Sequence, residues 1–227
     1  MKLTISKEVF NTFHPDFAVI FLRVNNIHNQ HLRESRHLVQ EMEEEIRRTH
    51  HPDTIKNHYL ISPWVAAQQA FGQVSHYQTS VERILQQVLR KKTVVTNHTL
   101  GNIMRYLMLK YLVPMSADDC QKVRGNITFA IAKGGEKISF SHSLVRGALY
   151  YHDSKRVLGT KLDHWKNPVT RTTPHTTQAL VHLGGLPPLT LPKLLLVAEE
   201  AQQLLETFCG TTVKKVQVHR RKATVMI

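Results

Sequence analysis

The stretch TLGNIMRYLMLKYLVPMSADDCQKVRGNITFAIAKGG, residues 99–135, decides the fold class because its hydrophobic period changes partway along. Its first part repeats apolar residues at the spacing of one helical face, and Pro114 prevents that helix from continuing. Residues 127–132 instead alternate large apolar with smaller side chains up to the Gly134-Gly135 turn. The stretch therefore predicts a helix over 99–111, followed by a half-buried strand.

Capping residues mark the starts of the other helices. Thr79 and Glu82 stand three apart, which is the spacing of a capping box, and an apolar stripe follows them. Asn29 can cap a long amphipathic helix, whose acidic cluster is most simply a solvated face. Ser62-Pro63 combines a cap with a proline at the first helical position, and Gly72 permits that helix to stop.

Strand signals occupy the rest of the chain. Short runs of strand length occur at residues 3–5, 17–22, 148–151, 156–158 and 179–183. A final helix is expected to begin at Thr190 and to end at Gly210. Helices at both ends of a strand-rich middle predict an α+β fold, a single domain with a central mixed or antiparallel sheet flanked by helices.

Composition bounds the class of protein. The chain has 227 residues, 41% of them hydrophobic and 21% charged, which suits one large globular domain. No apolar run is long enough for a membrane span, and the first residues lack the apolar core of a secretory signal. Cys120 and Cys209 are too few for a disulfide framework or a cysteine zinc site. A cytoplasmic protein without membrane contact is the simplest expectation.

The net charge points toward a polyanionic partner. Thirty Lys and Arg against 17 acidic residues leave a formal charge of +13 at pH 7. Such a field concentrates RNA, although an ordinary basic surface is the alternative explanation. The segment 211–227 is particularly basic and is expected to form either an added edge strand or a tail.

Motifs for common enzyme chemistries are missing. The chain has no GxSxG elbow, no Walker loop, no GxGxxG after a strand and no HExxH. Lys133-Gly134-Gly135-Glu136 can be interpreted as a phosphate cradle, but a two-glycine turn between strands explains it better. No metal and no cofactor are predicted from these patterns.

Several short motifs together resemble a known module. They keep its order and spacing from about Tyr59 to Gly210: Ser75-x-Tyr77-x-Thr79-Ser80-Val81-Glu82, Tyr106-x-x-Leu109-Lys110-Tyr111-x-x-Pro114, Gly125-Asn126-Ile127, Gly135-Glu136 and Thr173-x-x-Thr176-x-x-Ala179. The chain resembles a stand-alone form of the editing domain of the phenylalanyl-tRNA synthetase beta subunit. That resemblance implies an α+β domain over 59–210, an N-terminal strand-helix extension over 1–58 packed on it, and a basic C-terminal segment over 211–227.

The same resemblance implies a function. In the synthetase, the module hydrolyses the ester of wrongly attached tyrosine on the phenylalanine tRNA, because one binding pocket cannot reject a near-isostere well enough. The partner expected here is the aminoacylated 3′ end of a tRNA, whose phosphates the basic surface would neutralise. A trans-acting aminoacyl-tRNA editing hydrolase is the first hypothesis. A catalytically inactive tRNA-binding module and an amino-acid or metabolite binder are the alternatives.

Some candidate site residues come from the positions that match the synthetase motifs. Where the synthetase has Thr-Asn before the helical tyrosine and a histidine after the proline, this chain has Met104, Arg105 and Ser116. Arg105 could contact a phosphate or a substrate carboxylate, or lie in water. Ser116 is expected in a turn, where it could cap the next segment or contact substrate.

The remaining candidates lie in the second half of the chain. Trp165, Lys166 and Asn167 could stack on a terminal base, meet a phosphate and orient an ester, or Trp165 could simply cover a sheet edge. Lys133 and Thr173 are further candidate substrate contacts. Catalysis would consist of positioning water and stabilising an oxyanion, with Glu136 and Asn167 as the candidate catalytic residues.

Overall fold

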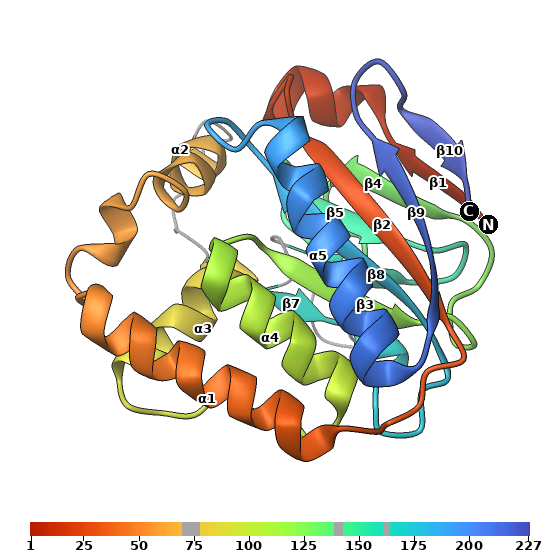
Figure 1. Ribbon diagram of the computed structural model, residues 1–227. Coiled ribbons are helices and arrows are strands. Elements are labelled where there is room, and N and C mark those ends of the chain that lie inside the picture. Colours follow the sequence, from red (N-terminus) through yellow and green to blue (C-terminus); the bar gives the residue numbers. More distant parts are fainter. Residues whose placement is uncertain (70–77, 139–142, 161–163) are drawn as a thin grey trace.

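A computed structural model describes residues 1–69, 78–138, 143–160 and 164–227, and it has an α+β fold with two sheets (Figure 1), as predicted. The six-stranded sheet has the order β10 (Thr224–Met226), β1 (Lys2–Ile5), β4 (Ile127–Ile131), β5 (Leu149–His152), β6 (Val157–Thr160) and β7 (Trp165–Lys166). Strands β1 and β4 pair in parallel and the other neighbours are antiparallel. The four-stranded antiparallel sheet has the order β3 (Met115–Asp119), β8 (Gln178–Gly185), β2 (Ala18–Asn25) and β9 (Thr212–Val218).

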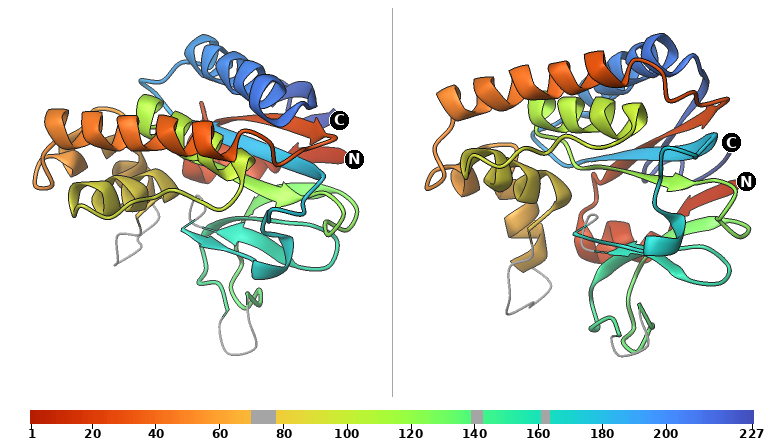
Figure 2. Two further views of the ribbon diagram at one scale, coloured as in Figure 1. Left: turned by 60° about the horizontal axis from the view of Figure 1, so that its bottom comes forward. Right: turned by 90° about the horizontal axis from the view of Figure 1, so that it is seen from below.

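Helices cover one face of the four-stranded sheet, and the six-stranded sheet covers the other (Figure 2). The α-helices are α1 (Leu32–Thr49), α2 (Ser62–Gln69), α3 (Ser80–Leu89), α4 (Thr99–Tyr111) and α5 (Leu191–Cys209). Short turns of π or 3₁₀ helix span Val9–Phe13, Ile55–Asn57 and Pro168–Thr170. The chain thus forms a helical layer, a central sheet and an outer sheet.

Strand β2 explains how two cores are built around one sheet. Ile20 and Leu22 face the helices, whereas Val19 and Phe21 face the six-stranded sheet. All four side chains are buried, so a strand covered on both faces appears in the sequence as a continuous apolar run. Helix α5 packs across β2 and β8 on the helical side.

The local predictions are confirmed at the helix ends. Thr79 Oγ1 accepts a hydrogen bond from the Glu82 amide at 3.3 Å, and the Glu82 carboxylate accepts one from the Thr79 amide at 2.8 Å. Helix α4 has the predicted bounds, and strand β4 begins at Ile127 as predicted but ends at Ile131, one residue early. Gly210 ends α5 in the left-handed region, with φ of 59°. The predicted stop at Gly72 lies outside the described residues.

Three predictions are wrong for non-local reasons. The acidic cluster of the long helix is not wholly a solvated face, because Glu43 is buried and its carboxylate accepts from the Val94 amide at 2.6 Å. Asn29 does not cap the long helix, which begins at Leu32; its Oδ1 accepts from the amide of Thr99 at 2.7 Å and so caps α4 instead. Ser116 does not lie in a turn, because it pairs with His182 inside strand β3. The segment after Gly210 forms the edge strands β9 and β10 rather than a tail.

Candidate functional site

A cavity of about 390 Å³ lies between α3, α4, β3 and residues 164–172 around β7 (the β7 loop). Its polar wall carries six basic side chains: Arg83, His98, Arg105, His164, Lys166 and Arg171. Among the described residues that line it there is no Asp or Glu. Met104, Met108 and Met115 form the apolar side. The volume falls in the range of small-molecule sites, and the lining selects for an anion with an apolar part.

Arg105 is the most exceptional group in this cavity. Its guanidinium makes no hydrogen bond and no ion pair with any residue in the described part of the chain. Burial and the neighbouring cation of Arg83 lower the pKa of Arg105 to about 10, so it stays charged at neutral pH. Desolvating a charge without a partner is costly, and an anion in the cavity would relieve that cost.

The other arginines anchor the backbone of the loop around β7. Arg83 donates from Nη1 to the carbonyl oxygen of His164 at 2.8 Å. Arg171 donates from Nη2 to the carbonyl oxygen of Lys166 at 3.3 Å. These contacts fix the loop that closes one side of the cavity. Arg105 therefore differs from both, since its donors remain available to a ligand.

Lys166 is neutralised within the protein. Its ammonium lies 2.5 Å from Asp118 Oδ2 and 4.9 Å from the centre of the Tyr151 ring. The Tyr151 hydroxyl also donates to Asp118 Oδ2, at 3.1 Å. Asp118 is 1% exposed, and its Oδ1 has no hydrogen-bond partner among the described residues. Lys166 therefore lines the cavity with its charge already balanced by Asp118.

His98 and Thr172 meet on the cavity wall. His98 Nε2 lies 3.1 Å from Thr172 Oγ1, although 74 positions separate them in the chain. Burial and the charge of Arg105 lower the pKa of His98, which favours its neutral form. Sequence analysis missed this histidine. His98 lies seven positions before Arg105, or about two helical turns, so the helical repeat could have placed both on one face.

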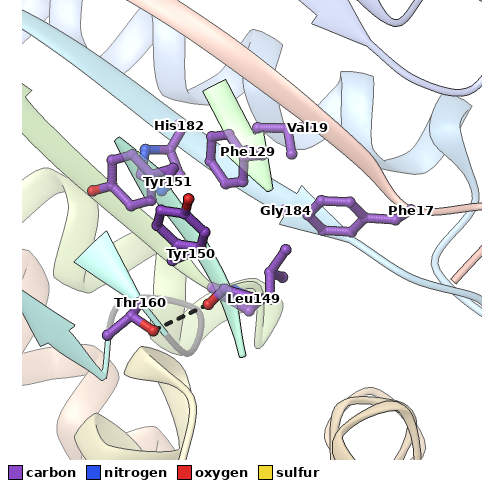
Figure 3. A pocket seen from close by; sticks show the side chains of 10 residues that line it. Phe17, Val19, Phe129, Leu149, Tyr150, Tyr151, Thr160, His182 and Gly184 are labelled. Atoms are coloured by element: carbon purple, nitrogen blue, oxygen red, sulfur yellow. Dashed lines mark hydrogen bonds between the residues drawn. The ribbon is translucent and has the colours of Figure 1, made fainter. Parts of the chain in front are cut away.

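A second, much smaller cavity lies between the two sheets (Figure 3). Phe17, Phe129, Tyr150, Tyr151 and His182 surround about 10 Å³, which leaves room for about one water molecule. The rings of Phe129 and Tyr151 stack with centroids 4.8 Å apart. At this volume the aromatic cluster is packed core.

The structure brings together three of the predicted site residues. Arg105, Ser116 and Lys166 all line the larger cavity. Ser116 is 8% exposed and lies on β3, opposite the buried His182. These residues come from α4, β3 and β7, so their convergence is a property of the tertiary fold.

Asn167 and Trp165 flank Lys166 but do not line the cavity. The Asn167 side chain donates from Nδ2 to the Val157 carbonyl oxygen at 2.8 Å. Its Oδ1 accepts from the Val169 amide at 3.0 Å and so caps a 3₁₀ turn. Trp165 packs against a small apolar cluster that includes Leu144. Both side chains hold the β7 loop in place.

Glu136, Lys133 and Thr173 also lie outside the cavity lining. The Glu136 carboxylate accepts from the amides of Lys133 and Gly134, at 2.7 and 3.0 Å. Burial opposes ionisation of Glu136, but these hydrogen bonds outweigh it and lower its pKa. Thr173 Oγ1 accepts from the His175 amide at 3.3 Å in a turn.

Two general features complete the description of the site. In the part of the chain that the structure describes, no three His, Cys, Asp or Glu side chains gather closely enough to hold a metal ion. None of the described helices combines the length and apolar character needed to cross a membrane.

Comparison with known proteins gives a resemblance at the level of the fold. No protein-family model and no curated protein sequence matches the chain. Among solved structures, the chain is similar to an N-terminal fragment of the phenylalanyl-tRNA synthetase beta subunit from Pyrococcus horikoshii, with a TM-score of 0.51 and 8% sequence identity. The match covers 95% of this chain and 53% of that fragment, so this chain spans about half of its length. Ser75 and Tyr77 of the sequence motifs lie outside the described residues. The chain therefore shares a fold with a part of a tRNA synthetase subunit.

Proposed function

We propose that this protein binds the aminoacylated 3′ end of a tRNA in the cavity around Arg105 and hydrolyses its aminoacyl ester. The observation that carries the proposal is the guanidinium of Arg105, which has no partner among the described residues and lies in a cavity whose described lining is cationic and holds no carboxylate. The formal charge of +13 supports binding of a polyanion, and the fold resemblance supports a tRNA as that polyanion. A cytoplasmic location follows from this choice of substrate.

The cavity suits the chemistry of ester hydrolysis. Negative charge develops on the carbonyl oxygen in the transition state, and a preorganised cation lowers the energy of that charge. Arg105 supplies this cation, and it has no ion pair with a described residue that would first have to break. The methionine wall offers apolar surface to the base or to the amino-acid side chain. Residues 59–210 would carry this function, with 1–58 packed on them and 211–227 adding positive charge.

The direct test is deacylation of a panel of mischarged tRNAs by the purified chain, with a known editing domain as positive control. We expect at least one ester to be hydrolysed, and Arg105→Gln to reduce the rate by about 100-fold, as expected for loss of one oxyanion donor. Arg36→Gln is the matched control, because Arg36 is exposed on α1 and does not line this cavity. A panel that stays fully acylated while the control enzyme works would refute the hydrolase.

A binding module without turnover is the second candidate. It is favoured by the position of the predicted carboxylate Glu136, which is held by backbone amides outside the cavity. Salt-dependent binding of tRNA that Arg105→Gln weakens, combined with no deacylation, would select this function. The cavity volume also suits a small anionic metabolite or amino acid. Thermal stabilisation by such a compound, with indifference to tRNA, would select that third function.

A further inference from the structure

The contact between His98 and Thr172 has the geometry of a base and a nucleophile. His98 Nε2 lies 3.1 Å from Thr172 Oγ1, within hydrogen-bond reach, and both residues line the cavity. On the other side of the ring, Nδ1 lies 3.3 Å from the side-chain oxygen of Asn97. An amide oxygen only accepts, so it selects the tautomer with the proton on Nδ1. The lone pair of Nε2 is then free to accept the Thr172 hydroxyl proton.

Gly101 makes room for the imidazole ring. A Cβ added at Gly101 would lie 2.7 Å from Cε1 and 2.8 Å from Nε2 of His98, and 2.5 Å from Thr96 Oγ1. Contacts this short are repulsive, so any larger residue at 101 would displace the ring. Helix α4 therefore leaves space for the His98 ring at its third residue, Gly101, which has no side chain.

We propose that Thr172 is the nucleophile of this cavity, that His98 is its general base, and that Arg105 stabilises the oxyanion. The substrate class, an aminoacyl ester, rests on the proposed function. Thr172 Oγ attacks the ester carbonyl while its proton passes to His98 Nε2, and the negative charge on the carbonyl oxygen is held by Arg105. Collapse breaks the bond to the ribose oxygen, which takes the proton from His98. Water, deprotonated by His98, then attacks the carbonyl of the acyl-threonine. The bond to Thr172 Oγ breaks, Oγ takes the proton back from His98, and the free amino acid leaves.

The surroundings of His98 favour its neutral imidazole, which can accept a proton. The charged groups lining the same cavity are Arg83 from α3, Arg105 from α4, and Lys166 and Arg171 from the β7 loop, together with the titratable His164. No Asp or Glu of the described chain lines it with them. Burial and the Arg105 cation lower the pKa of His98. A neutral imidazole at pH 7 can accept a proton from the hydroxyl.

An activated ester can test the nucleophile and its base without knowledge of the natural substrate. Rapid mixing with p-nitrophenyl acetate, a denaturing quench and peptide mass spectrometry should show an acetyl group on Thr172. The adduct should persist in Thr172→Ser, on the serine, and disappear in Thr172→Ala and His98→Gln. Its rate of formation should fall as the pH drops below 6.5, the ordinary pKa of histidine. Gly101→Ala should suppress the adduct without removing either reacting group.

Each outcome decides one claim. An acetyl group on Thr172 that depends on His98 supports the pair even if no mischarged tRNA is deacylated, in which case only the tRNA substrate fails. Where deacylation occurs, Thr172→Ala should slow it by about 100-fold or more, whereas Thr12→Ala, an exposed threonine outside the cavity, should not. Deacylation that survives Thr172→Ala, or a wild-type chain without an adduct on Thr172, overturns the inference.

Discussion

The guanidinium of Arg105 shares a cavity with that of Arg83, and burial together with this second cation lowers the pKa of Arg105 to about 10. Two like charges in one partly buried space destabilise the folded chain when no anion lies between them. Such an arrangement is typical of binding sites, where stability is lost in favour of ligand recognition. Removal of the Arg105 charge should therefore raise stability while it impairs function.

Arg105→Met should stabilise the protein while it abolishes anion binding. Methionine extends the apolar wall formed by Met104 and Met108 and removes the unpaired charge, so we expect the free energy of unfolding to rise by about 1 kcal/mol. Urea denaturation measures the gain and a filter-binding assay with tRNA measures the loss. Arg36→Met is the control, because that exposed side chain should contribute to neither effect. A clear fall in stability would mean that Arg105 already has an internal partner.

Lys166 and Asp118 should behave as one energetic unit. Lys166→Met leaves a buried carboxylate without its counterion, and we expect a loss of about 3 kcal/mol in the free energy of unfolding. The double variant Lys166→Met with Asp118→Asn should be less destabilised than Lys166→Met alone, because the neutral amide no longer needs a cation. Arg48→Met, at the exposed Arg48–Glu45 pair, should cost less than about 1 kcal/mol. Additive effects of Lys166→Met and Asp118→Asn in a double-mutant cycle would rule out the coupling.

The capping box predicts a large difference between two threonines at helix starts. Thr79→Ala removes an acceptor for the Glu82 amide and should lower the free energy of unfolding by about 1 kcal/mol. Thr190 occupies the same position before α5, but its side chain makes no capping hydrogen bond. Thr190→Ala should therefore leave chemical denaturation unchanged. Equal effects of the two substitutions would contradict the assignment of stability to the cap.

Features set by near neighbours in the chain could be predicted from the sequence. The Thr79 cap, helix α4 and strand β4 each depend on residues within a few positions of one another. Strand β3 was not predicted, because its sequence, MSADD, is polar although all five residues are buried. Distant residues permit this burial: Lys166 and Tyr151 both contact Asp118 Oδ2 from the other sheet.

The same limit applies to the candidate site. Arg105, Ser116 and Lys166 were expected as contacts, and the fold brings them to one cavity. His98 and Thr172 could not be paired from the sequence, since 74 positions separate them and no motif links them. A residue type suggests what chemistry is possible, whereas the contact between α4 and the β7 loop decides which residues meet.

Two histidines should make stability depend on pH just below neutrality. Burial lowers the pKa of His98 and of His58, with a further effect of Arg105 on the first and of His50 on the second. The unfolded chain, with the ordinary value of 6.5, then binds more protons than the folded chain. The free energy of unfolding should therefore rise with pH through the window just below 6.5 and level off above it. Urea denaturation across this window should show a smaller slope in either His98→Gln or His58→Gln. Only His98→Gln should also abolish the reaction with p-nitrophenyl acetate, because His58 does not line the cavity. A slope that survives in the double variant would assign the pH dependence to other groups.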